Sequence, residues 1–206
     1  LYHLEHNHEN ARVLVQRHGL GDAARWVVVN EPMAPPTTEE LDAVHELPFA
    51  REAHPSYGAA RIPALEQIRW SVAILRGCAA GCSFCCITEH QGRDVSSRSR
   101  ASVLREIEAL TRQPGFRGTV TDLGGATANM WGMGCTSARA HAACRRLSCV
   151  HPSRCRFFAV DHGPLVQLYR EARAVKGVKH AFVGSGVCND LAHADPRNGR
   201  AYLEEL

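Results

Sequence analysis

The sequence predicts an α/β fold in which short parallel strands alternate with amphipathic helices. From residue 67 onward, brief strand-like runs are followed by helical patterns, an order typical of βαβ units with parallel pairing. The predicted strands also end in glycine or polar turns, and the carboxyl ends of parallel strands are where such folds carry their chemistry. About four β/α units are visible, too few for a closed barrel of eight units and fewer than a partial barrel of six.

Residues 1–66 predict an irregular N-terminal lead-in, part of a longer N-terminal region, without a core of its own. Prolines and short, interrupted patterns dominate this part of the sequence. It is expected to contain a short helix at 11–18 that Gly19 ends, a β-like run at 26–29, a proline-rich connection at 30–38, a helix capped by Thr38 that reaches about Glu46, and an irregular stretch at 47–63.

Residues 67–206 predict the core domain. Ile68, Trp70, Val72 and Ile74 alternate with other side chains, a strand signal with a period of two. Because only about four units precede Leu206, the domain is expected to be incomplete at its C-terminal end. Further strands are expected at 119–123, 156–160 and 180–183, and amphipathic helices after the N-cap Ser99 and at 165–175.

Composition excludes several classes of function. The 206 residues include 24 basic and 21 acidic ones, a net charge of +3, which gives no clear nucleic-acid surface. The sequence contains no membrane-length apolar run and no signal peptide, so we expect a cytoplasmic protein. In that compartment the nine cysteines are more plausible metal ligands than disulfide partners. The missing initiator Met suggests a fragment.

Cys78, Cys82 and Cys85 follow the first core strand in the spacing C-x3-C-x2-C. Three thiolates this close in sequence suit three corners of a cubane iron–sulfur cluster and leave one iron open for a substrate or cofactor. A zinc knuckle or scattered buried thiols are the alternatives. A zinc site needs a fourth nearby ligand, and Cys86 adjoins Cys85 too closely to share one ion with it.

A second cysteine group lies between residues 135 and 155. Four thiols on an irregular stretch can close a tetrahedral site for structural zinc or an auxiliary cluster, and neighbouring arginines would offset the negative charge. The alternative is that some of these thiols are buried as small hydrophobic side chains, as we expect for the isolated Cys188. The predicted second metal site consists of Cys135, Cys144, Cys149 and Cys155.

Several motifs together resemble the YgiQ family of radical S-adenosylmethionine (SAM) proteins. The cysteine loop with its aromatic Phe84 resembles the signature of the radical SAM superfamily. The remaining motifs are N-A-R-V-L-V-Q-R-H-G, H-P-S-Y-G, A-R-I-P-A, I-T-E-H-Q-G-R, D-L-G-G-A-T-A-N-M and A-C-R-R-L-S-C. Cys86 departs from this family, which more often has a small polar residue there. The resemblance covers essentially the whole chain and implies that sequence is missing at both ends.

The resemblance implies a radical SAM core domain over residues 67–206, in the form of a partial parallel barrel. It also implies a [4Fe–4S] cluster on Cys78, Cys82 and Cys85 with SAM on the open iron. The implied SAM contacts are Phe84 in the cysteine loop, Gly124 and Gly125 at the amino group, Ser185 at the ribose and Arg98 at the carboxylate. Arg98 as a solvated helix-entry residue and Gly124–Gly125 as a plain tight turn are the alternatives.

The implied function is reductive cleavage of SAM. An external flavodoxin- or ferredoxin-like donor would reduce the cluster, and the resulting 5′-deoxyadenosyl radical would act on an unidentified substrate. A methylthiotransferase-like enzyme with a second cluster is one alternative. The other alternative is a non-catalytic binding module in which zinc or a cluster only stabilises the fold. Asp161 and His162, after the third predicted strand, either face a substrate or cap the next helix.

Overall fold

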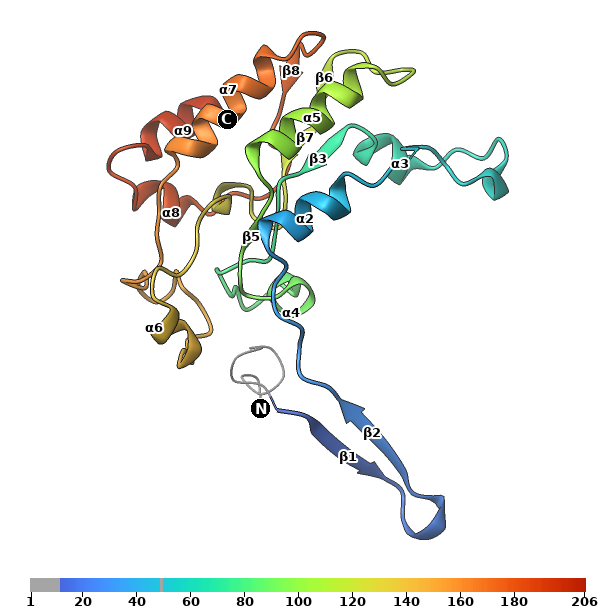
Figure 1. The fold of residues 1–206 in the computed structure, drawn as a ribbon, viewed down its shortest axis with the longest axis vertical. Coiled ribbons are helices and arrows are strands. Elements are labelled where there is room, and N and C mark those ends of the chain that lie inside the picture. The colour runs from blue at the N-terminus through green and yellow to red at the C-terminus, as the bar shows by residue number, and fades with distance from the viewer. Residues whose placement is uncertain (1–11, 49) are drawn as a thin grey trace.

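The computed structural model describes residues 12–48 and 50–206, and Figure 1 shows a mixed α/β body with a hairpin that projects from it. Among these residues, no helix is long and apolar enough to cross a membrane. The strands are β1 (Leu14–His18), β2 (Arg25–Val29), β3 (Ser71–Ala73), β4 (Leu75–Arg76), β5 (Ser96–Ser97), β6 (Thr119–Val120), β7 (Asp122–Gly124) and β8 (His180–Ala181). The helices are η1 (Gly21–Ala23), α2 (Thr38–His45), η2 (Pro55–Tyr57), α3 (Pro63–Ile68), α4 (Ile87–Gln91), α5 (Arg100–Thr111), η3 (Ala128–Met130), α6 (Ala138–Ala142), α7 (Gly163–Ala174), α8 (Asn189–His193) and α9 (Gly199–Glu205).

Parallel strands form the centre of the body, as the sequence predicts. β3 pairs with β7 and β6 pairs with β8, both in parallel. The N–H of Leu123 also donates to the carbonyl O of Phe182 at 2.8 Å, so the segment that contains β6 and β7 lies between β3 and β8. The strands of the described part of the chain form small sheets and close no barrel. The α/β class is therefore confirmed, whereas a partial barrel stays a prediction.

The two long predicted helices are confirmed, and they form the core with the strands. α5 begins after Ser99, whose Oγ accepts a hydrogen bond from the N–H of Ser102 at 3.1 Å. The apolar stripe of α5, including Ile107, and that of α7, including Leu165 and Leu168, are fully buried. Because Cys78 belongs to the same buried cluster, the cysteine loop is anchored in this core.

The predicted helix at 11–18 is wrong where the structure describes it. β1 instead pairs antiparallel with β2, with Leu14 opposite Val29 and Val15 opposite Val28. The three consecutive valines of β2 favour an extended backbone, and Gly19 turns the hairpin with a φ of +82°. Residue 11 lies outside the described residues. The strand predicted at 26–29 is confirmed, and the hairpin extends away from the body in Figure 1.

α2 connects the lead-in to the core. It is N-capped by Thr37, one residue earlier than predicted, and Thr37 forms a capping box with Glu40. Asp42 of α2 accepts a hydrogen bond from the N–H of Ser99 at 2.9 Å. The start of α5 is therefore fixed from the lead-in side.

Two predicted strand segments are corrected. The strand expected from Ile68 begins only at Ser71, because Pro63 starts α3, which continues to Ile68. The strand expected at 156–160 is a turn. Only an isolated bridge joins Phe158 to Cys135, and the N–H of Ala159 donates to the carbonyl O of Gly134 at 2.9 Å. This apolar run packs across the segment at 134–136 and does not join the parallel strands.

We predict that Glu106→Ala will lower the free energy of unfolding by about 3–5 kcal/mol. The Glu106 carboxylate pairs with both Arg98 and Arg51, and all three side chains are at most 10% exposed. Its loss leaves two buried guanidinium groups without their shared counter-charge. Urea denaturation measures the change, and Glu108→Ala, an exposed residue on the same helix, should change it by less than about 0.5 kcal/mol. Equal effects of the two substitutions would contradict a buried ion-pair network.

Candidate functional site

The cysteine loop follows β4 and turns back into the core. Cys78 is buried, whereas Cys82 and Cys85 are half-buried. The N–H of Cys78 donates to the carbonyl O of Gly92 at 3.0 Å, and the N–H of Cys85 donates to the carbonyl O of Cys82 at 3.0 Å. These bonds fix both ends of the motif.

Two glycines allow this loop to form. Gly77 and Gly81 have φ values of +83° and +58°. A Cβ at Gly77 would lie 1.8 Å from the carbonyl O of Asp94, and one at Gly81 would lie 2.2 Å from that of Leu147. Only glycine fits this combination of positive φ and close backbone approach. The loop is therefore held tightly between two other segments.

The three thiols of the motif lie close enough to influence one another. Burial, followed by the neighbouring thiols of Cys78 and Cys85, raises the pKa of the Cys82 thiol. Across residues 12–48 and 50–206, no three Cys, His, Asp or Glu side chains lie close enough together to bind a single metal ion. The cysteine sulfurs of a cubane cluster lie farther apart than the ligands of a single ion, because each cysteine binds its own iron. Three cysteine thiols form a soft donor set of the kind that binds iron–sulfur clusters or zinc.

Thr127 and Cys188 are two neighbours of the loop that sequence reasoning missed. Thr127 Oγ1 lies 3.0 Å from Cys78 Sγ. Burial raises the pKa of the half-buried Cys188 thiol, and the nearby thiols of Cys78 and Cys82 also contribute to the shift. Thr127 comes three residues after Gly124, so its place beside the strand end is a sequence signal. No feature of the sequence around Cys188 indicates that it lies near the cysteine loop.

The glycine turn and Ser185 meet at the carboxyl edge of the strands, where Asp122 holds them together. Asp122 Oδ1 accepts from the N–H groups of Gly184 and Ser185 at 2.8 and 3.0 Å, and Ser185 Oγ donates to Asp122 Oδ2. The N–H of Gly125 donates to Ser185 Oγ at 3.1 Å. A Cβ at Gly124 would lie 2.6 Å from this hydroxyl oxygen. Asp122 is the organising residue here, and sequence reasoning assigned it no role.

Arg98 and Phe84 are placed differently from this group. The Arg98 side chain is 1% exposed, and its guanidinium donates to the carbonyl O of Ala73 at 2.9 Å and to Ser102 Oγ at 2.8 Å, besides pairing with Glu106. Arg98 is therefore not a solvated residue, which was the alternative to the predicted SAM contact, and these bonds do not join it to the glycine turn. Phe84 is 90% exposed at the surface of the cysteine loop.

Asp161 and His162 have structural partners. Asp161 Oδ1 accepts from the N–H of Gly163 at 2.9 Å, at the start of α7. His162 is fully buried, with Nδ1 3.0 Å from Asp195 Oδ2 and Nε2 3.1 Å from Asn129 Nδ2. Asp161 thus binds the first N–H of α7, although the N-cap residue of this helix is His162.

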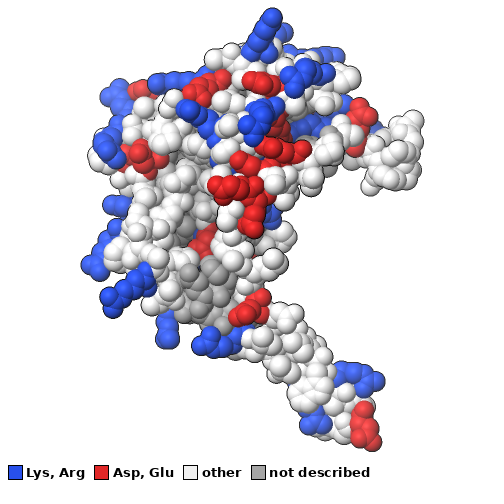
Figure 2. Space-filling view, in the orientation of Figure 1, with Lys and Arg blue, Asp and Glu red and all other residues white. Residues whose placement is uncertain are grey.

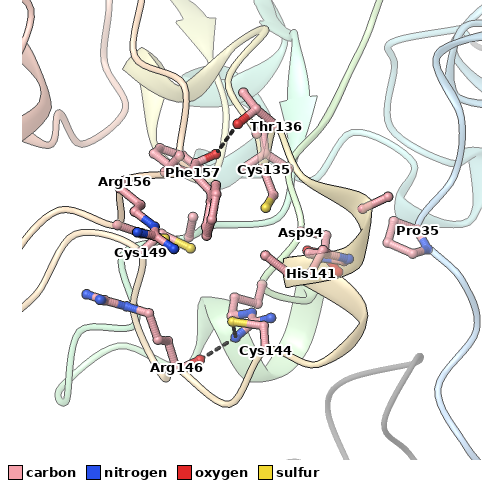
Figure 3. Close-up of a pocket in the computed structure, with 18 of the residues that line it drawn as sticks. Pro35, Asp94, Cys135, Thr136, His141, Cys144, Arg146, Cys149, Arg156 and Phe157 are labelled. Atoms are coloured by element: carbon pink, nitrogen blue, oxygen red, sulfur yellow. Dashed lines mark hydrogen bonds and ion pairs between the residues drawn. The ribbon is translucent and has the colours of Figure 1, made fainter.

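The second cysteine group lines one cavity of about 960 Å³, shown in Figure 3. Burial raises the pKa of the Cys149 thiol to about 11; Arg93 acts in the opposite direction, and the other three thiols raise it further. All four cysteines therefore lie near one another, although 20 residues separate the first from the last. Four residues that line this cavity were predicted from the sequence as ligands of a second metal site: Cys135, Cys144, Cys149 and Cys155.

The two cysteine groups are neighbours in space. The N–H of Cys149 donates to the carbonyl O of Ala79 at 2.9 Å, and Gly81 packs directly against Leu147. Ala79 also lines the cavity of the second group. No disulfide joins the cysteines of the described residues.

Comparison with known proteins finds relatives that are similar over the whole chain. Residues 1–71 match the family model described as Radical SAM N-terminal. The whole chain is 51% identical to the UPF0313 protein YgiQ of Salmonella typhimurium and to that of Escherichia coli K12, and it covers 28% and 27% of their lengths. A UPF0313 protein of Rhodopseudomonas palustris is 51% identical over 99% of this chain, which covers 29% of the relative.

Residues 1–71 thus resemble the N-terminal part of radical SAM proteins. The whole chain is similar to the YgiQ (UPF0313) proteins, which confirms the resemblance predicted from the motifs. The chain spans a little over a quarter of the length of the curated relatives it matches.

We predict that Gly81→Ala will destabilise the protein more than Gly132→Ala. Both glycines have positive φ, but only Gly81 has a backbone carbonyl in the place of the new methyl group. The additional loss in the free energy of unfolding should be about 1–3 kcal/mol, as for overpacked cores. Urea denaturation of both variants measures it, and equal losses would mean that the loop does not press on residue 147.

Proposed function

We propose that this protein is a radical SAM enzyme that holds a [4Fe–4S] cluster on Cys78, Cys82 and Cys85. The observation that carries the proposal is the position of these three thiols, on a loop that leaves β4 beside the glycine turn after β7. The resemblance of residues 1–71 to radical SAM proteins supports the same chemistry. When bound, the cluster and SAM supply reductive cleavage of the sulfonium C–S bond and a 5′-deoxyadenosyl radical that abstracts hydrogen from a substrate.

The residues of the loop have separate tasks in this proposal. Cys78, Cys82 and Cys85 each bind one iron, and the thiols must lose their protons to do so. Cys78 is buried in the core, whereas Cys82 and Cys85 are half-buried, so a cluster held by all three would be accessible from the side of Cys82 and Cys85. The exposed Phe84 lies at the same surface. This position supports reduction by an external flavodoxin- or ferredoxin-like protein in the cytoplasm.

SAM is assigned to the carboxyl edge next to the loop. The Gly124 carbonyl already accepts a hydrogen bond from the N–H of Ile74 at 2.8 Å. We therefore assign the SAM ammonium group to the carbonyl of Gly125, with Gly124 providing space. Ser185, whose hydroxyl Asp122 orients, is assigned to the ribose. Because Arg98 is occupied by internal partners, the contact with the SAM carboxylate is not assigned to it.

A two-cluster enzyme of the methylthiotransferase-like kind is the second candidate, because the second cysteine group adjoins the first loop. A non-catalytic protein whose metal only stabilises the fold would release no 5′-deoxyadenosine from SAM and reductant. An assay for this product on the full-length protein therefore distinguishes both enzymes from the non-catalytic alternative.

We predict that the triple substitution of Cys78, Cys82 and Cys85 by alanine will remove about four iron atoms per chain from the reconstituted full-length protein. The release of 5′-deoxyadenosine from SAM should fall to background, because no open iron remains. Iron analysis and product chromatography under anaerobic conditions measure both. Cys86→Ala, which changes the exposed neighbouring thiol, should retain the iron. Unchanged iron content in the triple variant would contradict the assignment of the cluster to these three cysteines.

We predict that Ser185→Ala will weaken SAM binding about 5–10-fold, the effect of losing one well-oriented hydrogen bond of roughly 1 kcal/mol. The substitution also removes the partner of Asp122 and of the Gly125 N–H. Equilibrium dialysis of SAM with the cluster-loaded protein measures the change. Ser56→Ala, in the lead-in, should bind SAM like the wild type. A Ser185→Ala variant with wild-type affinity would contradict the ribose contact.

A further inference from the structure

We infer that the cavity beside α6 is a second metal centre, in which Cys135, Cys144, Cys149 and Cys155 hold an iron–sulfur cluster. The inference goes beyond the proposed function, because it does not require the first loop to bind anything. It is argued from the placement of the four cysteines, the size of the cavity between them and the charge of its walls.

Backbone hydrogen bonds fix the cysteines around one opening. The N–H of Cys155 donates to the carbonyl O of Cys149 at 2.8 Å, and the N–H of Cys144 donates to that of His141 at 2.9 Å. Cys135 is bridged to Phe158, which follows Cys155 by three residues. In Figure 3, Cys135, Cys144 and Cys149 surround the opening from different segments of the chain. The four thiols are therefore brought together by the fold and not by sequence proximity.

The size of the cavity favours a cluster over a single ion. A tetrahedral zinc site with Zn–S bonds of about 2.3 Å needs its sulfurs about 3.8 Å apart. Within the described parts of the chain, no group of three or more Cys, His, Asp or Glu side chains is arranged to hold a metal ion. The same cysteines nevertheless line a space of about 960 Å³. A polynuclear cluster fills the centre of such a site and lets each thiolate bind a different iron.

The charge of the walls suits an anionic centre. Arg93, Arg145, Arg146 and Arg156 line the cavity, against Asp94 as the single acidic lining residue. Arg93 Nη1 lies 3.6 Å from Cys144 Sγ. Blue side chains, which are arginines in this part of the sequence, also lie around the α6 region in Figure 2. Four thiolates with an iron–sulfur core carry net negative charge, which these guanidinium groups offset.

Arginine also shapes the loop that carries the ligands. Arg146 donates to the carbonyl O of Ser148 at 2.9 Å and to that of Ser153 at 2.5 Å, and Arg93 donates to the carbonyl O of Arg146. Cys149 and Cys155 pack against the hydrophobic core on one side. On the other side they line the cavity together with four arginines, which core packing alone does not require. The combination is typical of a ligand site and not of core packing.

The test uses the full-length protein with Cys78, Cys82 and Cys85 replaced by alanine, so that the first loop contributes no iron. After anaerobic reconstitution with iron and sulfide, this variant should retain about four iron atoms per chain and a sulfur-to-iron charge-transfer absorption. Adding Cys144→Ser and Cys149→Ser should abolish both. Adding Cys86→Ser, an exposed thiol outside the cavity, should leave both unchanged.

Less than one iron per chain in the first variant, or about one zinc and no iron, would overturn the inference. If that variant does not fold, the wild type is compared with Cys144→Ser/Cys149→Ser, with circular dichroism as the folding control. A loss of about four iron atoms supports the second centre, and no loss overturns it. Failure of the proposed function gives a different result, in which replacing the first three cysteines removes no iron.

Discussion

The close approach of the backbone at residues 79–81 to the backbone at 147–149 is the constraint on which both cysteine groups depend. A Cβ at Gly81 would lie 2.2 Å from the carbonyl O of Leu147, and the N–H of Cys149 donates to the carbonyl O of Ala79 at 2.9 Å. This contact holds the cysteine loop against the segment that carries the second group. A side chain at Gly81 would separate them, because backbone atoms cannot rotate away as a flexible side chain can.

The carboxyl edge of the parallel strands supplies the second constraint. β4 leads into the cysteine loop, β7 ends at the glycine turn, and Ser185 follows β8. Asp122 connects the last two, since its carboxylate accepts hydrogen bonds from Gly184 and from the backbone and hydroxyl of Ser185. A charged acceptor with three donors is strongly held, so this part of the edge is organised before any ligand arrives. Such preorganisation lowers the entropic cost of binding.

The sequence predicted those parts of the fold that local patterns determine. The Ser99 cap, the apolar stripes of α5 and α7 and the parallel pairing all depend on short-range spacing or on alternation of elements. The predictions that were wrong depended on distant partners. β1 has residues at helical spacing, but it forms a strand because the valines of β2 pair with it. Cys188 packs against the core, as predicted, but the sequence around it does not indicate that it lies near Cys78 and Cys82. The cysteine motif itself is local, and its spacing alone indicated the candidate site.

The most direct test of the central claim is the electron paramagnetic resonance spectrum of the reduced full-length protein, recorded with and without SAM. The Cys144→Ser/Cys149→Ser background leaves the first loop as the source of the signal. Three cysteines around a cubane leave one iron open, so SAM bound there changes the environment of the unpaired electron. We predict a signal whose g values shift when SAM is added. An identical spectrum with and without SAM would contradict the assignment of Cys78, Cys82 and Cys85 to an open, SAM-binding cluster.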